Sequence, residues 1–167
     1  MPEKKNPAGK TQTATFGAGC FWGVEETFRR LPGVIGTSAG YTGGKTKDPA
    51  YKDVCTGGTG HAEAVQVVFD PEKISYGELL NVFWENHNPT TPNQQGPDAG
   101  NQYRSVIFFH TPAQKRLAED SKANLEKSGK WNWRKIVTEI VPAQEFYMAE
   151  EYHQKYLSKR GLGNCHI

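Results

Sequence analysis

The spacing of apolar side chains near the start of the chain predicts a helix over residues 20–31. Its apolar residues recur every three or four positions, as on one face of an amphipathic helix: Phe21, Val24, Phe28 and Leu31. Pro32 and Gly33 follow directly. Because proline cannot continue a helix and glycine suits a turn, we expect the helix to end there.

Two further helices are predicted from their capping residues. Ser75 and Glu78 stand three positions apart, as in a capping box, where each side chain binds the free backbone N–H of the other residue. Thr111 and Gln114 repeat this spacing. We expect the two helices to cover residues 76–87 and residues 111 to about 127.

Runs of β-branched and aromatic residues predict five strands, and a last helix is expected near the end. The strands cover residues 13–18, 34–41, 61–69, 103–109 and 136–141, and the helix covers 149–160. The order β-α-β-β-α-β-α-β-α, with helices on one face of a mixed sheet, predicts a two-layer α+β domain. The long connections over 42–60 and 88–102 have little regular structure, which is typical of functional loops.

The chain of 167 residues is long enough for one domain, and we expect a single catalytic domain over residues 13–160. The polar segment 1–12 and the tail 161–167 are expected to be mobile. The N-terminus lacks the apolar centre of a signal peptide, and no apolar run approaches the roughly 20 residues of a membrane helix. We therefore expect a cytoplasmic protein without a membrane partner.

The small net charge and two incomplete motifs argue against other classes of function. The net charge of +2 is too small to favour a nucleic-acid partner, and the interleaved charges of the C-terminal half indicate solvated helix faces. The loop over residues 39–46 resembles a phosphate-binding loop, but it has alanine for the first glycine and no helical pattern after it. His61-Ala62-Glu63 matches half of a zinc-deaminase motif whose PCxxC partner is absent, so we expect no metal site.

The three cysteines, Cys20, Cys55 and Cys165, include no CxxC pair, which argues against a disulfide framework and a thiolate zinc site. Cys20 stands where a glycine turn enters a helix, and the positive end of the helix dipole favours a reactive thiolate there. A small buried hydrophobe fits the local sequence equally well. Cys165 is either a resolving thiol for Cys20 or an incidental terminal cysteine, and Cys55 is interpreted as a packed or spare thiol.

Three further side chains are candidates for the surroundings of Cys20. Phe21 and Trp22 point about 100° apart on a helix, so at least one should border the thiol, although each could instead belong to the core. Glu63 follows a glycine loop between two alanines. In apolar surroundings its carboxyl would hold a proton at neutral pH, whereas an exposed strand edge would leave it ionised.

Taken together, the segments GCFWG, AGYTGG, GHAEAV, FWENH and QYRS resemble the peptide methionine sulfoxide reductase A family, from about Phe16 to Cys165. The resemblance implies a two-layer α/β plait of the ferredoxin-like type with long loops. It implies reduction of methionine S-sulfoxide, free or in oxidised proteins, with no bound cofactor and with a dithiol such as thioredoxin as the reductant. We also expect a monomer.

The resemblance assigns a chemical role to five residues. Cys20 matches the nucleophile, Glu63 the acid, and Cys165 the resolving cysteine. Tyr51 and Tyr103 match the two tyrosines that hydrogen-bond the sulfoxide oxygen. Three classes compete with this one: a thiol peroxidase, which consumes hydrogen peroxide, a nucleotide-binding protein that uses the loop over residues 39–46, and an interaction domain without sulfenic acid chemistry.

The resemblance also implies how substrate is held. Phe21 and Trp22 match the aromatic pair that holds the S-methyl group, and Asp98 matches a loop aspartate that contacts the substrate backbone. Cys55 matches a family cysteine that is not generally the resolving one. Since only Cys165 follows these positions, a one-step disulfide is expected rather than a relay.

Overall fold

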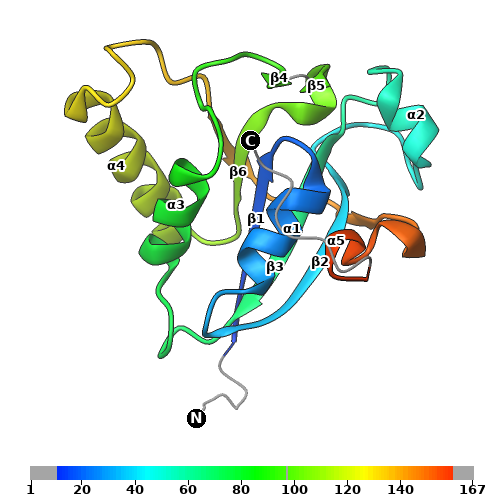
Figure 1. Cartoon of the computed structure of the whole chain (residues 1–167), viewed down its shortest axis with the longest axis horizontal. Helices are drawn as coiled ribbons and strands as arrows, with labels where there is room; N and C mark the ends of the chain where they lie inside the picture. Colours follow the sequence, from blue (N-terminus) through cyan, green and yellow to red (C-terminus); the bar gives the residue numbers. More distant parts are fainter. Residues whose placement is uncertain (1–10, 97, 160–167) are drawn as a thin grey trace.

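A mixed six-stranded sheet with the order β7-β6-β1-β3-β2-β8 forms the centre of the computed structural model, which describes residues 11–96 and 98–159 (Figure 1). Neighbouring strands are antiparallel except for β6 and β7, which are parallel. The strands are β1 (Gln12–Ala18), β2 (Val34–Thr42), β3 (Ala62–Phe69), β6 (Ser105–Phe109), β7 (Glu139–Pro142) and β8 (Tyr147–Met148). A separate hairpin pairs β4 (Gln94–Gln95) with β5 (Asp98–Ala99).

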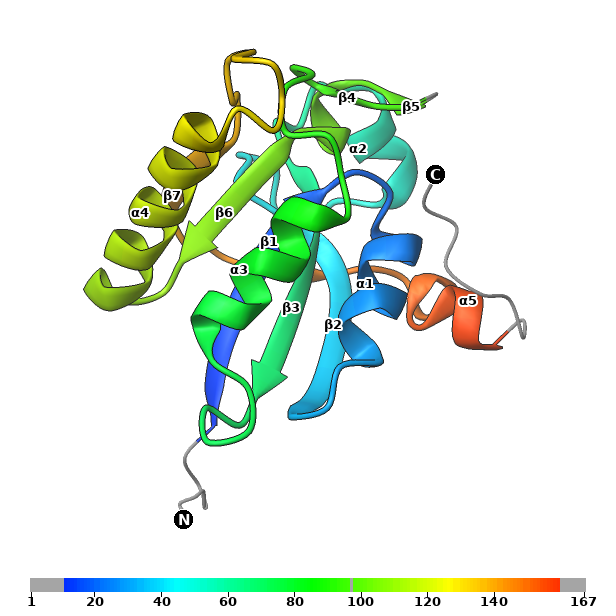
Figure 2. The same cartoon turned by 60° about the vertical axis from the view of Figure 1, so that its left-hand side comes forward.

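Three helices cover one face of this sheet, as Figure 2 shows: α1 (Phe21–Arg29), α3 (Tyr76–Glu85) and α4 (Pro112–Ser128). The short helices α2 (Tyr51–Cys55) and α5 (Tyr156–Lys159) lie outside this layer. Two 3-10 turns complete the described elements, η1 (Asn101–Tyr103) and η2 (Glu151–His153). The chain is therefore an α+β domain with a mixed sheet and flanking helices, as the sequence predicts.

The main core lies between the helices and the sheet and is built around the ring of Phe16 on β1. The rings of Phe28, Phe83 and Tyr76 stack on it at centroid distances of 5.1, 5.2 and 6.1 Å. Burying aromatic rings of this size contributes strongly to stability. The apolar spacing of the sequence thus places Phe28 and Phe83 on the faces that meet β1.

Alternation along β3 decides which of its side chains face the helices. Val65, Val67 and Phe69 belong to the main core, whereas Ala62 and Ala64 pack on the opposite face of the sheet. Because successive strand residues point to opposite faces, Glu63 shares the helix-covered face with the three apolar residues. A carboxyl group therefore lies in an apolar layer.

The predicted capping residues are confirmed for α3 and half confirmed for α4. Ser75 Oγ accepts the N–H of Glu78 at 3.0 Å, and Glu78 Oε1 accepts the N–H of Ser75 at 2.9 Å. Thr111 Oγ1 likewise accepts the N–H of Gln114 at 3.1 Å. The prediction of a reciprocal bond from the N–H of Thr111 to Gln114 is wrong. Gln114 Oε1 accepts the N–H of His110 instead, at 2.9 Å.

The predicted final helix over residues 149–160 is wrong. The described part of this segment forms η2 and the single turn α5, because its side chains bond back to the sheet. Gln154 accepts the N–H of Ala39 and donates to the carbonyl of Ala39, both at 2.8 Å. Lys155 has a left-handed backbone, with φ of 51°, which an α-helix cannot contain.

Several predicted boundaries also differ. The strand expected from residue 136 begins at Glu139, because the N–H of Val137 donates to the carbonyl of Pro89 at 2.8 Å. The long loop after β2 contains the unpredicted helix α2. Gln12, expected in a mobile segment, begins β1 opposite Phe69. Residues 1–10 and the tail with Cys165 lie outside the described residues.

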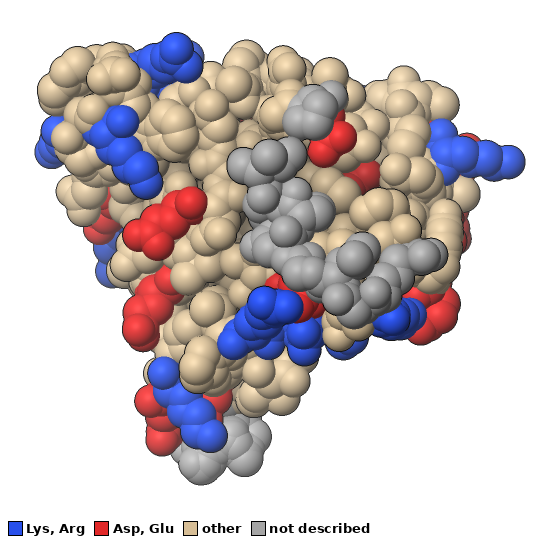
Figure 3. Space-filling model, viewed as in Figure 1, with Lys and Arg blue, Asp and Glu red and all other residues tan. Residues whose placement is uncertain are grey.

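The surface mixes both signs of charge on the face drawn in Figure 3. Lys and Arg side chains are scattered among Asp and Glu side chains there, and the described residues of this face show no broad patch of one sign. Within residues 11–96 and 98–159, no helix is both long enough and apolar enough to cross a bilayer.

Replacing Gln154 by alanine is expected to lower the free energy of unfolding by about 1–3 kcal/mol, because the buried N–H of Ala39 loses its acceptor. Gln144→Ala is the matched control, since Gln144 is exposed in the loop between β7 and β8. The control should change the stability by less than about 0.5 kcal/mol. Urea unfolding followed by tryptophan fluorescence measures both variants. Equal losses in the two would contradict this role of Gln154.

Candidate active site

Cys20 lies at the turn that joins β1 to α1. Gly19 takes a φ of 98°, and a Cβ atom there would lie 2.9 Å from Cγ of Gln95, so the turn requires glycine for two reasons. The helix begins at Phe21, one residue later than predicted, and Cys20 is its N-cap residue. The half-buried thiol thus lies at the positive end of the helix dipole, which favours an anion.

Glu63 lies beneath this helix start, almost completely buried, with 1% of its surface exposed. Its Oε1 accepts the N–H of Phe21 at 3.2 Å, and its Oε2 has no hydrogen-bond partner among the described residues. Burial raises the pKa of Glu63 to about 8; the Phe21 N–H opposes this rise, and the charge of Asp98 adds to it. A buried carboxyl whose pKa is raised therefore lies beside the residue that follows Cys20.

Tyr51 and Tyr103 approach the same region from two separate loops. Tyr51 is the first residue of α2, and Tyr103 is the last residue of η1. Burial raises the pKa of Tyr103 to about 12 and moves the pKa of Tyr51 in the same direction. Glu63 contributes to both shifts through its charge. Both phenols thus remain proton donors at neutral pH.

The aromatic pair divides between the core and the surface. Phe21 is buried, with its ring 5.7 Å from that of Tyr41. Trp22 is half-buried and stacks on Tyr156 with a centroid distance of 3.7 Å. The indole N–H of Trp22 donates to Nδ1 of His153 at 2.9 Å. The pair therefore has two separate environments, as the 100° rotation predicts.

Two residues that hold this arrangement, His153 and Glu150, carry no signal in the sequence. The ring of His153 is buried and lies 4.6 Å from that of Tyr51 and 5.1 Å from that of Phe21. Burial lowers the pKa of His153, so the ring is neutral and accepts from Trp22. Glu150 accepts the N–H of Tyr51 at 2.9 Å. Both residues stand in the segment that was expected to be a regular helix.

A cavity of about 610 Å³ opens beside the thiol, and both Cys20 and Asp98 line it. The end of α3, the β4-β5 hairpin and the start of the loop after α4 supply its other walls.

The part of the chain that the structure describes holds no group of three or more His, Cys, Asp or Glu side chains arranged for a metal ion. Cys55 is exposed on α2.

The structure thus brings together most of the predicted site residues. Cys20, Phe21 and Glu63 meet at the start of α1, and the charge of Asp98 acts on Glu63. Tyr51 and Tyr103 lie next to each other and are close enough to feel the charge of Glu63. The predicted resolving thiol of Cys165 lies outside the described residues.

Comparison with known proteins points to one family. The family model described as peptide methionine sulfoxide reductase matches residues 12–167. The peptide methionine sulfoxide reductase MsrA of Methanoculleus marisnigri is 59% identical, over 95% of this chain and 96% of that protein.

Solved structures give the same result. Mxr1 of Saccharomyces cerevisiae in its reduced form has a TM-score of 0.88 and 38% identity, covering 98% of this chain and 94% of that one. Mxr1 in complex with Trx2 has a TM-score of 0.63 and 28% identity, covering 92% and 88%. The chain therefore belongs to the peptide methionine sulfoxide reductase family.

Proposed function

We propose that this chain reduces methionine S-sulfoxide to methionine, with Cys20 as the nucleophile and Glu63 as the proton donor. Reduction of methionine sulfoxide is the activity that gives the family its name. One observation carries the assignment of residues: a buried carboxyl, protonated at neutral pH, is hydrogen-bonded to the backbone N–H that directly follows the half-buried cysteine. The positive end of the α1 dipole and the protonated acid thus serve the same reacting centre.

In the first step, the Cys20 thiolate attacks the sulfoxide sulfur. A bond forms between the two sulfurs as Glu63 gives its proton to the sulfoxide oxygen, and the bond between sulfur and oxygen breaks, so that the oxygen leaves as hydroxide. The hydroxide then attacks the Cys20 sulfur and the bond between the two sulfurs breaks. Methionine leaves with that electron pair, and Cys20 becomes a sulfenic acid. The sulfoxide sulfur is reduced by two electrons, and the cysteine sulfur is oxidised by two. The phenols of Tyr51 and Tyr103 donate hydrogen bonds to the departing oxygen. Proton transfer by a positioned group contributes roughly 10²–10⁴-fold to such a rate.

Substrate is held on two sides of the thiol. Phe21 and Trp22 present their rings to the S-methyl group, and the buried position of Phe21 supports a preformed apolar surface. Asp98 contacts the backbone of the substrate, since it lines the cavity beside Cys20. Oxidised proteins and free methionine sulfoxide are the proposed substrates.

In the second step, the thiol of Cys165 attacks the sulfenic acid, forms a disulfide with Cys20 and releases water. A dithiol then reduces this disulfide, and the complex of Mxr1 with Trx2 supports a thioredoxin in this role. The thiols supply both electrons, so we propose that the chain works without a bound cofactor. We further propose a cytoplasmic monomer, with residues 13–160 as one catalytic domain.

We also propose that the fold is a ferredoxin-like plait. The element order β1-α1-β2-β3-α3-β6 and the strand order β6-β1-β3-β2 support this description, because two split β-α-β units then share one antiparallel sheet. Strands β7 and β8 extend the sheet at its two edges.

Replacing the cysteines one at a time separates the two steps. Cys165→Ser is expected to release about one methionine per protein molecule and then stop, because Cys20 remains as a sulfenic acid that thioredoxin does not reset. Cys20→Ser should release none, and Cys55→Ser is the matched control that should keep full turnover. Rapid mixing with methionine S-sulfoxide, followed by mass spectrometry of each protein, measures these outcomes. Turnover of Cys165→Ser with thioredoxin at the wild-type rate would refute the assignment of Cys165.

The role of Glu63 predicts a pH dependence of the first step. The acid works only when protonated and its pKa is raised to about 8, so the rate of methionine release should fall as the pH rises through that value. Glu63→Gln should be slower by roughly 10²–10⁴-fold at pH 7 and should not show this fall. Single-turnover release between pH 6 and pH 9.5 is the measurement, with the exposed Glu72→Gln as control. A Glu63→Gln variant with the wild-type rate would exclude Glu63 as the acid.

A further inference from the structure

We propose that Gln95 is a positioning residue for the nucleophile, because its side chain holds the turn that carries Cys20 in the geometry required for attack on the sulfoxide. The inference rests on the proposed function and deepens it, since it names a residue that acts on Cys20 through the backbone of this turn. It is carried by two sets of contacts, one to the backbone of Asn88 and one to the turn at Gly19.

The side-chain amide of Gln95 joins the β4-β5 hairpin to the loop after α3. Its Oε1 accepts the N–H of Asn88 at 2.9 Å, and its Nε2 donates to the carbonyl of the same residue. The two polar atoms of the amide thus bind both backbone groups of one residue, which fixes the orientation of the amide. At its other end the side chain starts from β4, where the backbone of Gln95 pairs with Asp98. The aliphatic stem of Gln95 is therefore held at both ends.

This stem lies directly on the turn before Cys20. A Cβ atom added to Gly19 would lie 2.9 Å from Cγ and 3.0 Å from Cβ of Gln95, so the backbone of the turn and the stem are in close contact. Gly19 has a φ of 98°, and the helix that follows begins at Phe21. The backbone turn that directs the thiol of Cys20 is therefore packed against a side chain that the bonds to Asn88 keep in place.

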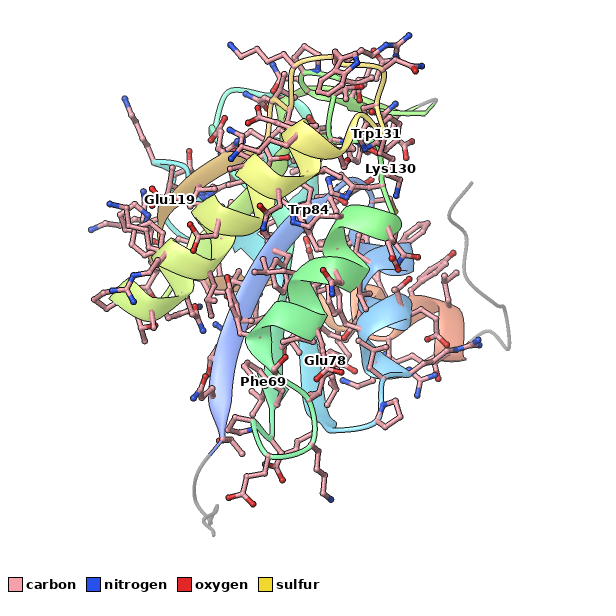
Figure 4. All side chains as sticks on the ribbon, turned by 90° about the vertical axis from the view of Figure 1, so that its left-hand side faces the viewer. Phe69, Glu78, Trp84, Glu119, Lys130 and Trp131 are labelled. Carbon is pink, nitrogen blue, oxygen red and sulfur yellow. The ribbon has the colours of Figure 1, made fainter. Side chains whose placement is uncertain are left out.

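Gln95 also places the thiol relative to the rest of the cavity. Gln95, Cys20 and Asp98 line the same space, which measures about 610 Å³. Figure 4 shows Lys130 and Trp131, which line it as well, past the C-terminal ends of α3 and α4. Gln95 is thus the wall residue that contacts the Cys20 turn and is paired with Asp98, so a shift of its stem would move the thiol relative to a bound substrate.

Such a shift is expected to lower the rate of the first step rather than the affinity for substrate. A misplacement of about 1 Å can lower a rate by roughly 10²-fold, because the reacting atoms no longer meet in line. The influence of the helix dipole also falls off within the first turn, so a displaced thiol would be less readily ionised. Gln95 holds no reacting atom in the proposed mechanism, and its loss should leave the KM nearly unchanged.

The test compares two neighbouring glutamines of β4. Gln95→Ala is expected to lower the single-turnover rate of release from methionine S-sulfoxide about tenfold, with little change in the KM. The pH profile for alkylation of Cys20 by iodoacetamide, followed by mass spectrometry to separate Cys20 from the other cysteines, should move to higher pH. Gln94→Ala is the matched control, because Gln94 is exposed and does not line the cavity. The control should keep the wild-type rate and profile.

Gln95→Met separates the two contacts and guards against misfolding. Methionine keeps a stem of similar length on Gly19 but cannot bind the backbone of Asn88, so its rate should lie between those of Gln95→Ala and the wild type. Wild-type rates in both Gln95 variants would overturn the proposal. It would also be overturned by a higher KM with an unchanged alkylation profile, which would mark Gln95 as a contact of the substrate. The proposed function fails separately, if the unmodified chain releases no methionine.

Discussion

The hydrogen bond from the Phe21 N–H to the buried carboxyl of Glu63 is the contact on which the rest of the site depends. It joins the turn after β1 to the start of β3, because Phe16 pairs with Val65 in antiparallel register, so the residues after Phe16 and the residues before Val65 reach the same end of the sheet. The apolar layer beneath α1 keeps the carboxyl protonated, and the helix start places Cys20 next to it. This one backbone donor therefore places the protonated carboxyl of Glu63 next to Cys20, whose thiolate form the helix dipole favours.

The segment after β8 fixes the remaining side chains of the site. Glu150 accepts from the hydroxyl of Tyr41 and from the backbone of Tyr51, both within 2.9 Å, and so ties α2 to β2. His153 supports Trp22, and the Gln154 side chain bonds to the backbone of β2. Because this segment is held by side chains rather than by a regular helix, its small irregular turns serve to position the aromatic residues.

Local rules predict the elements whose causes are local. The apolar period over residues 20–31 and the Ser75–Glu78 capping box are properties of neighbouring residues, and both helices form with boundaries shifted by one or two positions. The helix predicted over residues 149–160 is wrong for the opposite reason. Its conformation depends on bonds between residues more than 100 positions apart, as between Gln154 and Ala39, which no local pattern contains.

The residues of the candidate site also divide into those with a local signal in the sequence and those without one. Motifs and helix position indicate Cys20 and Glu63 from the sequence, and the alternation of β3 explains why the carboxyl is buried rather than exposed. His153 leaves no local signal, because its partner Trp22 lies 131 positions earlier in the chain. The cavity wall at Trp131 is equally hidden, since it forms only where the loop after α4 meets the end of α3.

The proposed mechanism requires that Glu63 holds a proton at neutral pH. Carbon-13 NMR of selectively labelled glutamate side chains, with Glu63→Gln to assign the resonance, measures this directly. The Glu63 carboxyl is expected to titrate with a pKa of about 8. A pKa near 4.5, the ordinary value for a glutamate, would contradict it.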